Sequence, residues 1–368
     1  MNDLIYKVAL TKIPLVGAVT AKNLVSYCGG AREVFETKKS HLLKIPGVGE
    51  RIATSILQKA ALEDAETELG FIENNGIRPL FYLDKNYPQR LRQFNDAPIM
   101  LYYKGTANLN FRRTVAIVGT RTPSPQGLSI CEEIVEDLVP YSPLVVSGLA
   151  YGIDVAAHRK CLEKGLETIA VLGHGLSRIY PPQHRKVALD MCEQGGLLTE
   201  FASHVGPERE NFPMRNRIVA GLSDALIVVE TATRGGSIIT AQQANGYSRE
   251  VFAVPGRVKD KFSQGCHFLI KNNLATLIEN VEDVAKVLRW EKQGDDGKET
   301  KPHQPELFLS LTEDEKKVVD LIQHHEEIGV DQLSYQTKVS SSELASLLLN
   351  LEFKGVVRSL PGKRYVLC

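Results

Sequence analysis

Six short apolar runs rich in valine and isoleucine recur along the middle of the chain, roughly 25 to 30 residues apart. Each run leads into glycine or small polar residues and then into a stretch with helical periodicity. Near-continuous hydrophobicity indicates strands that are covered on both faces, so we expect a mostly parallel, doubly wound α/β sheet. The runs are Val115–Val118, Leu144–Val146, Thr168–Leu172, Leu197–Thr199, Ala225–Val229 and Val251–Val254. This unit is predicted to end near Trp290.

A helical domain is predicted at residues 1–70, where KIPLVGAVTAKNLV and LLKIPGVGERIATSIL are related segments. The second has the helix-hairpin-helix form, with a Pro-Gly-Val-Gly turn and a helix that begins near Glu50. Glycines at a helix start let backbone amides approach a phosphate closely. A hairpin that only packs is an equal alternative, because such a turn needs glycine for steric reasons as well.

Residues 71–110 are expected to form a short helix and an extended strand, so that the central domain spans 71–290. Residues 291–305 contain no apolar side chain and are predicted to be a flexible linker. Residues 306–368 begin a helix with a capping box, in which Thr312 is the N-cap and Glu315 lies three residues later. Two further helical stretches, Val330–Gln336 and Ser341–Phe353, precede a hairpin-like end. Three helices and a small β-wing predict a winged-helix domain.

The formal charge of the chain is zero, with 44 Lys and Arg against 44 Asp and Glu. Basic residues outnumber acidic ones at 71–290, whereas acidic residues predominate at 306–368, so neutrality does not exclude a nucleic-acid ligand. The six cysteines form no CxxC pair and the histidines no HExxH motif, which predicts reduced thiols and no metal site. No apolar run is long enough for a membrane helix, and the first residues lack an export signal, so we expect a cytoplasmic protein.

Ligands of open α/β sheets bind beyond the carboxyl ends of the strands, where this chain has glycines and small hydroxyl residues. Such residues open helices and favour phosphate binding through backbone amides. They are Gly119, Thr120, Ser147, Gly148, Gly235, Gly236, Ser237 and Thr240. Gly173-His174-Gly175 is followed by Arg178 where a dinucleotide fingerprint needs glycine, and no Walker A loop is present, so no cofactor is expected.

Arginines gather in the same predicted loops and helix starts, at Arg121, Arg209, Arg215, Arg217 and Arg234. Several spaced cations suit several phosphates in a row, and Phe212 offers a flat face on which a base could stack. This pattern favours single-stranded nucleic acid.

Each of these assignments has a structural alternative. Phe212 could be a core residue, and Arg217 could pair with Asp224 or Glu230. Asp154 could only cap its helix, and Ser237 and Thr240 could be ordinary helix-start residues.

At these residues the sequence closely resembles the DprA/Smf family of bacterial DNA-processing proteins. The matching blocks are VAIVGTR, SGLAYGIDVAAH, AVLGHGLSRIYPPQH, FPMRNRIVAGLSDALIVVE, RGGSIITAQQA, VFAVPG and SQGCHFLI, in family order. The resemblance implies a Rossmann-like domain flanked by an N-terminal helix-hairpin-helix, or SAM-like, domain and a C-terminal winged helix. His184 and His267 stand where the family often has Asn, and Asn272-Asn273 replaces a common Gly.

The resemblance further implies a non-enzymatic, cytosolic homodimer that binds single-stranded DNA. Proteins of this kind protect incoming DNA and help to load the RecA recombinase during natural transformation. The family's Gly-Ser/Thr-Arg motif falls on Gly119, Thr120 and Arg121, and its Ser-Gly on Ser147 and Gly148. Its Phe-Pro-x-Arg-Asn motif falls on Phe212, Pro213, Arg215 and Asn216, with Arg209 as the preceding basic residue.

Two other classes of function stay open. The first is a nucleotide-processing hydrolase on a lysine-decarboxylase-like Rossmann scaffold, which needs a carboxylate after its glycine loop. Here Gln242 and Gln243 follow instead, although Glu200 and Glu230 lie at strand ends and could substitute. The second is an adaptor in which the acidic winged helix binds proteins.

Overall fold

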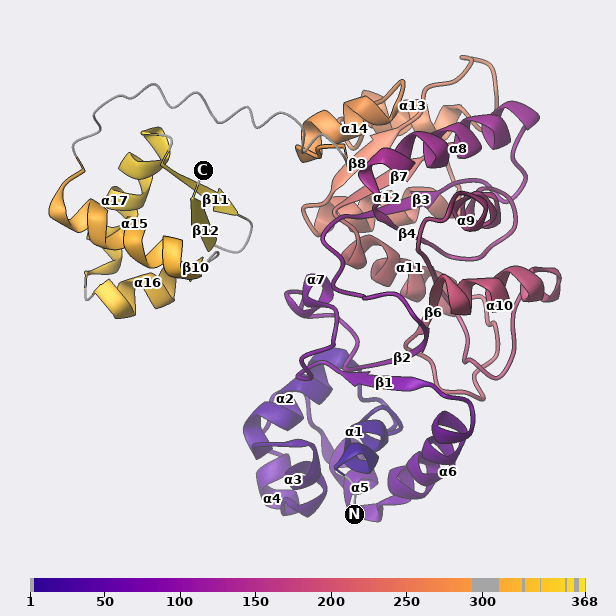
Figure 1. Ribbon diagram of the computed structural model, residues 1–368. Helices are drawn as coiled ribbons and strands as arrows, with labels where there is room; N and C mark the ends of the chain where they lie inside the picture. The colour runs from indigo at the N-terminus through magenta and orange to yellow at the C-terminus, as the bar shows by residue number, and fades with distance from the viewer. Residues whose placement is uncertain are drawn as a thin grey trace. The chain divides into compact units, whose positions relative to one another are not determined.

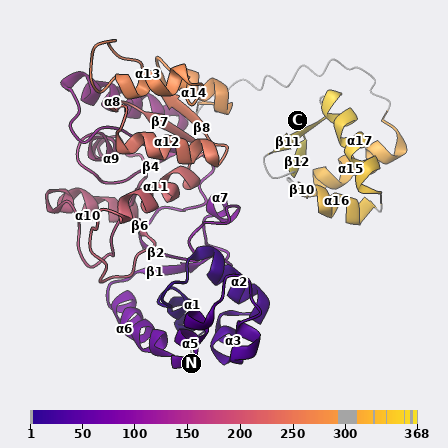
Figure 2. The same ribbon diagram turned by 180° about the vertical axis from the view of Figure 1, so that it is seen from behind.

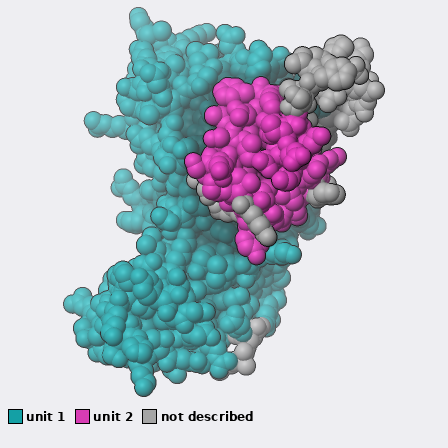
Figure 3. Space-filling model, turned by 90° about the vertical axis from the view of Figure 1, so that its left-hand side faces the viewer, with its two compact units in different colours: residues 1–295 teal, residues 296–368 magenta. Residues whose placement is uncertain are grey.

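The computed structural model describes residues 3–292, 311–325, 328–337, 339–354, 356–360 and 364–367. It divides into two compact units, residues 1–295 and 296–368, which Figure 3 distinguishes by colour. Residues 293–305 of the predicted linker lie outside the described residues. Within the described part, no helix is long and apolar enough to cross a membrane.

A nine-stranded sheet forms the centre of the first unit, in the order β1-β2-β6-β5-β4-β3-β7-β8-β9. The seven strands that run from β6 to β9 in this spatial order pair in parallel. Strand β2 pairs antiparallel with both β1 and β6. The strands are β1 (Arg78–Phe81), β2 (Met100–Gly105), β3 (Thr114–Val118), β4 (Leu144–Ser147), β5 (Thr168–Val171), β6 (Gly195–Thr199), β7 (Ala225–Val228), β8 (Glu250–Ala253) and β9 (Thr276–Leu277). The six apolar runs are therefore β3 to β8, and the predicted doubly wound sheet is confirmed.

Helices cover both faces of this sheet, as Figures 1 and 2 show from opposite sides. Side chains alternate along each strand: Val115 and Ile117 pack in the core of α8 and α9, whereas Ala116 and Val118 pack with α11 and α12. The helices of this region are α7 (Gln89–Arg92), α8 (Pro125–Leu138), α9 (Ile153–Lys164), α10 (Arg185–Glu193), α11 (Asn211–Leu222), α12 (Gly236–Gly246), α13 (Gln264–Lys271) and α14 (Val281–Leu288), with 3-10 turns at Val139–Tyr141 and Pro182–His184. Burial on both faces explains why the middle positions of these strands are apolar or glycine, while their polar residues stand at the strand ends.

Six helices precede the sheet and share a core with one face of β1 and β2, through Phe81, Met100 and Tyr102. They are α1 (Leu4–Leu10), α2 (Ala18–Cys28), α3 (Ala31–Glu36), α4 (Lys39–Leu42), α5 (Glu50–Gln58) and α6 (Ala60–Asn74). The two related segments adopt the same turn, since Gly17 and Gly49 are extended N-caps of α2 and α5. The predicted helix start at Glu50 is confirmed.

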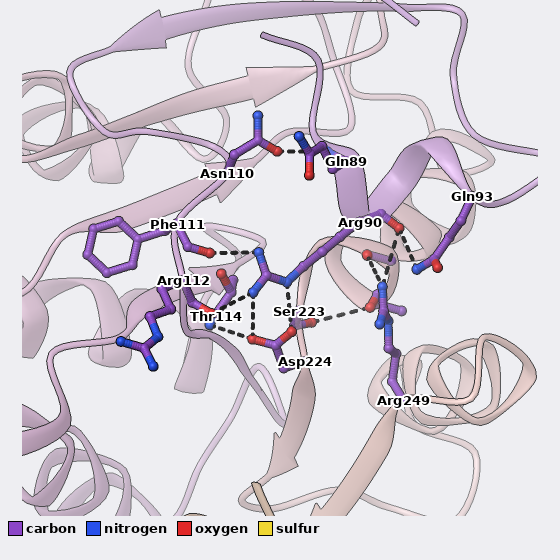
Figure 4. A network of polar contacts seen from close by, with 12 residues as sticks. Gln89, Arg90, Gln93, Asn110, Phe111, Arg112, Thr114, Ser223, Asp224 and Arg249 are labelled. Atoms are coloured by element: carbon purple, nitrogen blue, oxygen red, sulfur yellow. Dashed lines mark hydrogen bonds and ion pairs between the residues drawn. The ribbon is translucent and has the colours of Figure 1, made fainter. Parts of the chain in front are cut away.

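Short α7 is fastened to the sheet by a polar network around Arg90 (Figure 4). The Arg90 guanidinium donates to both carboxylate oxygens of Asp224, at 2.7 and 2.9 Å, and to the carbonyl oxygens of Phe111 and Arg112. Asp224 also accepts from the amide of Thr114 at the start of β3. Asp224 therefore pairs with Arg90, and the alternative pairing with Arg217 is wrong.

The described part of the second unit contains three helices and a three-stranded sheet of order β10-β12-β11. Its elements are α15 (Glu313–His325), β10 (Ile328–Gly329), α16 (Val330–Thr337), α17 (Ser341–Phe353), β11 (Val357–Leu360) and β12 (Arg364–Leu367). The predicted capping box is confirmed: the amide of Thr312 donates to Glu315 at 2.8 Å, and the amide of Glu315 donates to the Thr312 hydroxyl at 3.3 Å. The elements match the predicted winged helix.

Candidate functional site

The carboxyl ends of β3, β4 and β5 lie at one edge of the sheet. The strand order reverses beside them, because β6, β5 and β4 lie on one side of β3 and β7 lies on the other. The segments that follow β3 and β7 are tied together: the Thr120 amide donates to the Glu230 carbonyl oxygen at 2.6 Å. A Cβ on Gly119 would lie 2.5 Å from Cγ1 of Ile153, so only glycine fits there. Ligands of doubly wound sheets bind in the crevice at such a reversal of strand order.

A small pocket of about 60 Å³ lies at this edge. Its wall includes the exposed Arg121, whose guanidinium lies 5.4 Å above the ring of Phe212. Tyr180 also lines the pocket, and the centroid of its ring lies 6.2 Å from that of Phe212. The full lining is Arg121, Gly148, Ala150, Tyr151, Leu172, Gly173, His174, Tyr180, Pro181, Phe212 and Arg215. The pocket thus combines cations with partly exposed aromatic faces, as a nucleotide chain requires.

Arg215 lies in the wall of this pocket but is only 4% exposed. Its guanidinium donates to the carbonyl oxygen of Gly148 at 2.6 Å and to that of Val171, so it ties the loops after β4 and β5 together. Burial lowers the pKa of Arg215 to about 10, and Asp154 opposes this shift. Burial raises the pKa of Asp154, which Arg215 and the Ala150 amide lower. Arg215 therefore positions the pocket and keeps a positive charge in its wall.

The loop that carries Tyr180 is held by the segment after β6. The Gly175 amide donates to the Val205 carbonyl oxygen at 2.9 Å, and a Cβ on Gly175 would lie 2.0 Å from the Ala202 carbonyl oxygen. Glu68 of α6 accepts from the amide and hydroxyl of Ser203, at 2.8 and 3.1 Å. Glu68 is itself buried and pairs with Lys12 at 3.1 Å. The N-terminal helices thereby fix a loop of the site.

The structure gathers only some of the residues predicted from the sequence into this pocket, namely Arg121, Gly148, Phe212 and Arg215. Thr120 lies in the loop after β3. Ser147 is the buried last residue of β4, and its hydroxyl donates to the Ile117 carbonyl oxygen of β3. Asn216 accepts from Nε of Arg215, at 3.0 Å. Arg209 is exposed in the loop before α11.

The remaining predicted residues lie outside the pocket lining. Arg217 donates to Glu200 at 2.5 Å and to the Asp96 carbonyl oxygen at 2.8 Å, so its charge is already paired. Gly235, Gly236, Ser237 and Thr240 form the start of α12, and Ser237 and Thr240 are buried there. Their contact with a ligand stays a prediction.

The two carboxylates considered for a hydrolase are both engaged in structural contacts. Glu230 accepts from the amide and hydroxyl of Ser124, the N-cap of α8. Glu200 is paired with Arg217. Among the described residues, no carboxylate lines the pocket and no group of three candidate metal ligands occurs.

Sequence reasoning left Tyr151, His174 and Tyr180 out of the candidate site, although all three line the pocket. Burial lowers the pKa of His174, so the ring is held neutral, and its Nδ1 lies 2.8 Å from the Gly175 carbonyl oxygen. Tyr151 lies in the loop after β4, and Tyr180 lies in the loop after β5. Because both tyrosines follow predicted strands, their position in the sequence could have identified them as site residues.

Family models match all three regions of the chain. DNA recombination-mediator protein A matches residues 78–289, a DprA winged-helix domain matches 300–363, and a helix-hairpin-helix motif matches 8–65. Protein Smf from Synechocystis is 32% identical over 98% of both chains. DNA processing protein DprA from Streptococcus pneumoniae is 41% identical over 55% of this chain and 71% of its own length.

Two solved structures agree with this assignment. The X-ray structure of DprA from Streptococcus pneumoniae has a TM-score of 0.68 at 33% identity and covers 79% of this chain and 98% of its own. DNA processing protein A from Helicobacter pylori, described for its single-stranded DNA binding mode, has a TM-score of 0.53 at 28% identity, over 58% of this chain and 97% of its own. The chain therefore belongs to the DprA/Smf family of DNA-processing proteins.

Proposed function

We propose that the protein binds single-stranded DNA at the carboxyl edge of its sheet. The observation that carries the proposal is the pairing of Arg121 with Phe212 in one pocket, above the buried cation of Arg215. A base stacks on an exposed aromatic face, and the neighbouring guanidinium neutralises the adjoining phosphate. The relative from Helicobacter pylori, whose structure is described for single-stranded DNA binding, supports the same ligand.

Sequence-tolerant binding follows from this chemistry. Every base has a face that can stack on Phe212 or Tyr180, whereas reading a sequence needs polar side chains on base edges. Tyr180 is 43% exposed and Phe212 is partly exposed, so the two rings serve as an open platform. Arg209, exposed in the loop before α11, is a further candidate phosphate contact beside the helix that carries Phe212.

The biological role that we propose is that of a cytoplasmic, non-enzymatic homodimer which protects incoming DNA and promotes loading of the RecA recombinase during natural transformation. Membership of the family supports this role. We assign partner contacts or regulation to the acidic winged-helix domain, because its charge disfavours the phosphate backbone.

Fluorescence anisotropy with a labelled thymidine oligonucleotide tests DNA binding. We expect Arg121→Ala combined with Phe212→Ala to weaken binding by about 2 to 4 kcal/mol, because the variant loses one stacking face and one phosphate contact. Arg112→Ala is the matched control, since Arg112 is also exposed but precedes the amino end of β3. Wild-type affinity in the double variant would disprove the site. Release of a base from nucleoside monophosphates by the wild-type protein would instead favour a hydrolase.

A further inference from the structure

A second hollow, of about 430 Å³, lies on the other side of the loop that follows β5. Its lining is Lys104, Leu176, Ser177, Arg178, Ile179, Pro182, Arg185, Leu189, Cys192 and Leu197. Leu197 is buried in β6, while Leu189 of α10 is 58% exposed. A volume of this size is typical of small-molecule sites, in contrast to the pocket beside Phe212. We call this hollow the β6 pocket.

Three cations surround the apolar part of the β6 pocket: Lys104 on β2, Arg178 in the loop and Arg185 at the start of α10. None of the three forms an ion pair with a carboxylate in the part of the chain that the structure describes. Arg178 and Arg185 are exposed, so their charges are available to a ligand. The pocket therefore suits a ligand with an apolar, flat portion and negative charge next to it.

One loop separates the β6 pocket from the pocket beside Phe212. Gly173, His174, Tyr180 and Pro181 line the first pocket, and residues 176–179 with Pro182 line the second. A polyanion that leaves Phe212 across Tyr180 thus meets Arg178 within a few residues of the same loop. Because one loop lines both pockets, a linear ligand can pass from the first pocket to the second along that loop.

We infer that the β6 pocket binds a further nucleotide of the same single strand, with its base against Leu189 and Ile179 and its phosphates on Arg178 and Arg185. The inference rests on the proposed DNA binding and extends it: the strand follows the loop after β5 toward β6 and β2. An acidic peptide with apolar side chains has similar chemistry, but the loop shared with the first pocket favours the nucleotide.

Two thymidine oligonucleotides test the inference, one of about 5 nucleotides and one of about 15, which bracket the usual footprint of such sites. We expect Arg178→Gln with Arg185→Gln to weaken binding of the longer strand by about tenfold and to lower its salt slope by about 1.4, because two phosphate contacts are lost. The shorter strand should bind as it does to the wild type. Lys186→Gln is the matched control, since Lys186 is exposed on α10 but does not line the pocket.

Base contact is tested by Leu189→Gln, which should weaken binding of the longer strand but leave binding of its abasic analogue unchanged. If the Arg178/Arg185 variant binds the longer strand as the wild type does, the inference is overturned. If Arg121→Ala loses DNA binding in the same assay, the proposed function still stands. If the Arg178/Arg185 variant keeps its DNA binding but no longer binds a labelled Glu- and Leu-rich peptide that the wild type binds, the pocket is assigned to a protein ligand. Failure of the wild-type protein to bind either strand would overturn both proposals.

Discussion

Replacing Arg215 by methionine separates its structural role from direct DNA contact. The substitution keeps most of the buried volume but removes the guanidinium that donates to the carbonyl oxygens of Gly148 and Val171. A hydrogen bond from a charged donor contributes about 1.5 to 3 kcal/mol. The two bonds together predict that Arg215→Met lowers the free energy of unfolding by about 3 to 6 kcal/mol, a large share of the about 5 to 15 kcal/mol of a typical domain.

Urea unfolding, monitored by the fluorescence of Trp290, measures this effect. Trp290 is the only tryptophan of the chain, and it packs against the core of the first unit. Arg209→Met is the control: Arg209 is exposed, so its loss should change the free energy of unfolding by less than about 0.5 kcal/mol. A change below about 1 kcal/mol for Arg215→Met would refute the structural role of Arg215.

The same variant has a predicted pH dependence through Asp154. Burial raises the pKa of Asp154, and Arg215 opposes the shift, so the pKa of Asp154 rises further in Arg215→Met. A carboxyl whose pKa is raised by folding stabilises the folded state fully when the pH is below its unfolded pKa of about 3.9. This contribution to the free energy of unfolding is lost as the pH rises through the folded pKa. The stability gap between wild type and variant should therefore narrow as the pH falls from 8 through the raised pKa of Asp154. A gap that widens at pH 5 would contradict this reasoning.

Three further predictions concern residues around the site. Glu68→Ala should destabilise the protein by about 3 kcal/mol in urea unfolding, because it leaves a buried lysine unpaired, whereas exposed Glu66→Ala on the same helix should not. Gly175→Ala should abolish DNA binding in anisotropy assays, because its Cβ would overlap a backbone oxygen, whereas Gly206→Ala has free space and should bind normally. Burial lowers the pKa of His158 to about 3, so stability should fall by up to about 1.4 kcal/mol per unit as pH drops below 6.5, and His158→Gln should remove this slope in a urea series.

The sheet was predictable from the sequence because both of its faces are buried. Strands β3 to β8 each leave an uninterrupted apolar run, and the turns after them need glycine or small residues. Strand β9, at Thr276–Leu277, escaped prediction because it is a two-residue edge strand with exposed side chains. The capping box at Thr312 and Glu315 was recognisable because it depends only on residues three apart.

Contacts between distant residues were not predictable in the same way. Arg90 and Asp224 are 134 residues apart, and nothing near either one indicates the other. The sequence likewise placed Arg215 and Arg217 together as phosphate cations, but one is buried against carbonyl oxygens and the other is paired with Glu200. Local spacing identifies residues near a ligand edge, whereas their burial depends on tertiary packing.

Photocrosslinking tests the central claim most directly. A thymidine oligonucleotide that carries 5-iododeoxyuridine is irradiated with the wild-type protein, and the crosslinked residues are identified by mass spectrometry. The proposed stacking platform predicts crosslinks at Phe212 and Tyr180, which lie 6.2 Å apart at the pocket, and their loss in Arg121→Ala. Crosslinks confined to the N-terminal hairpins or to the winged-helix unit would contradict the site at the carboxyl edge of the sheet.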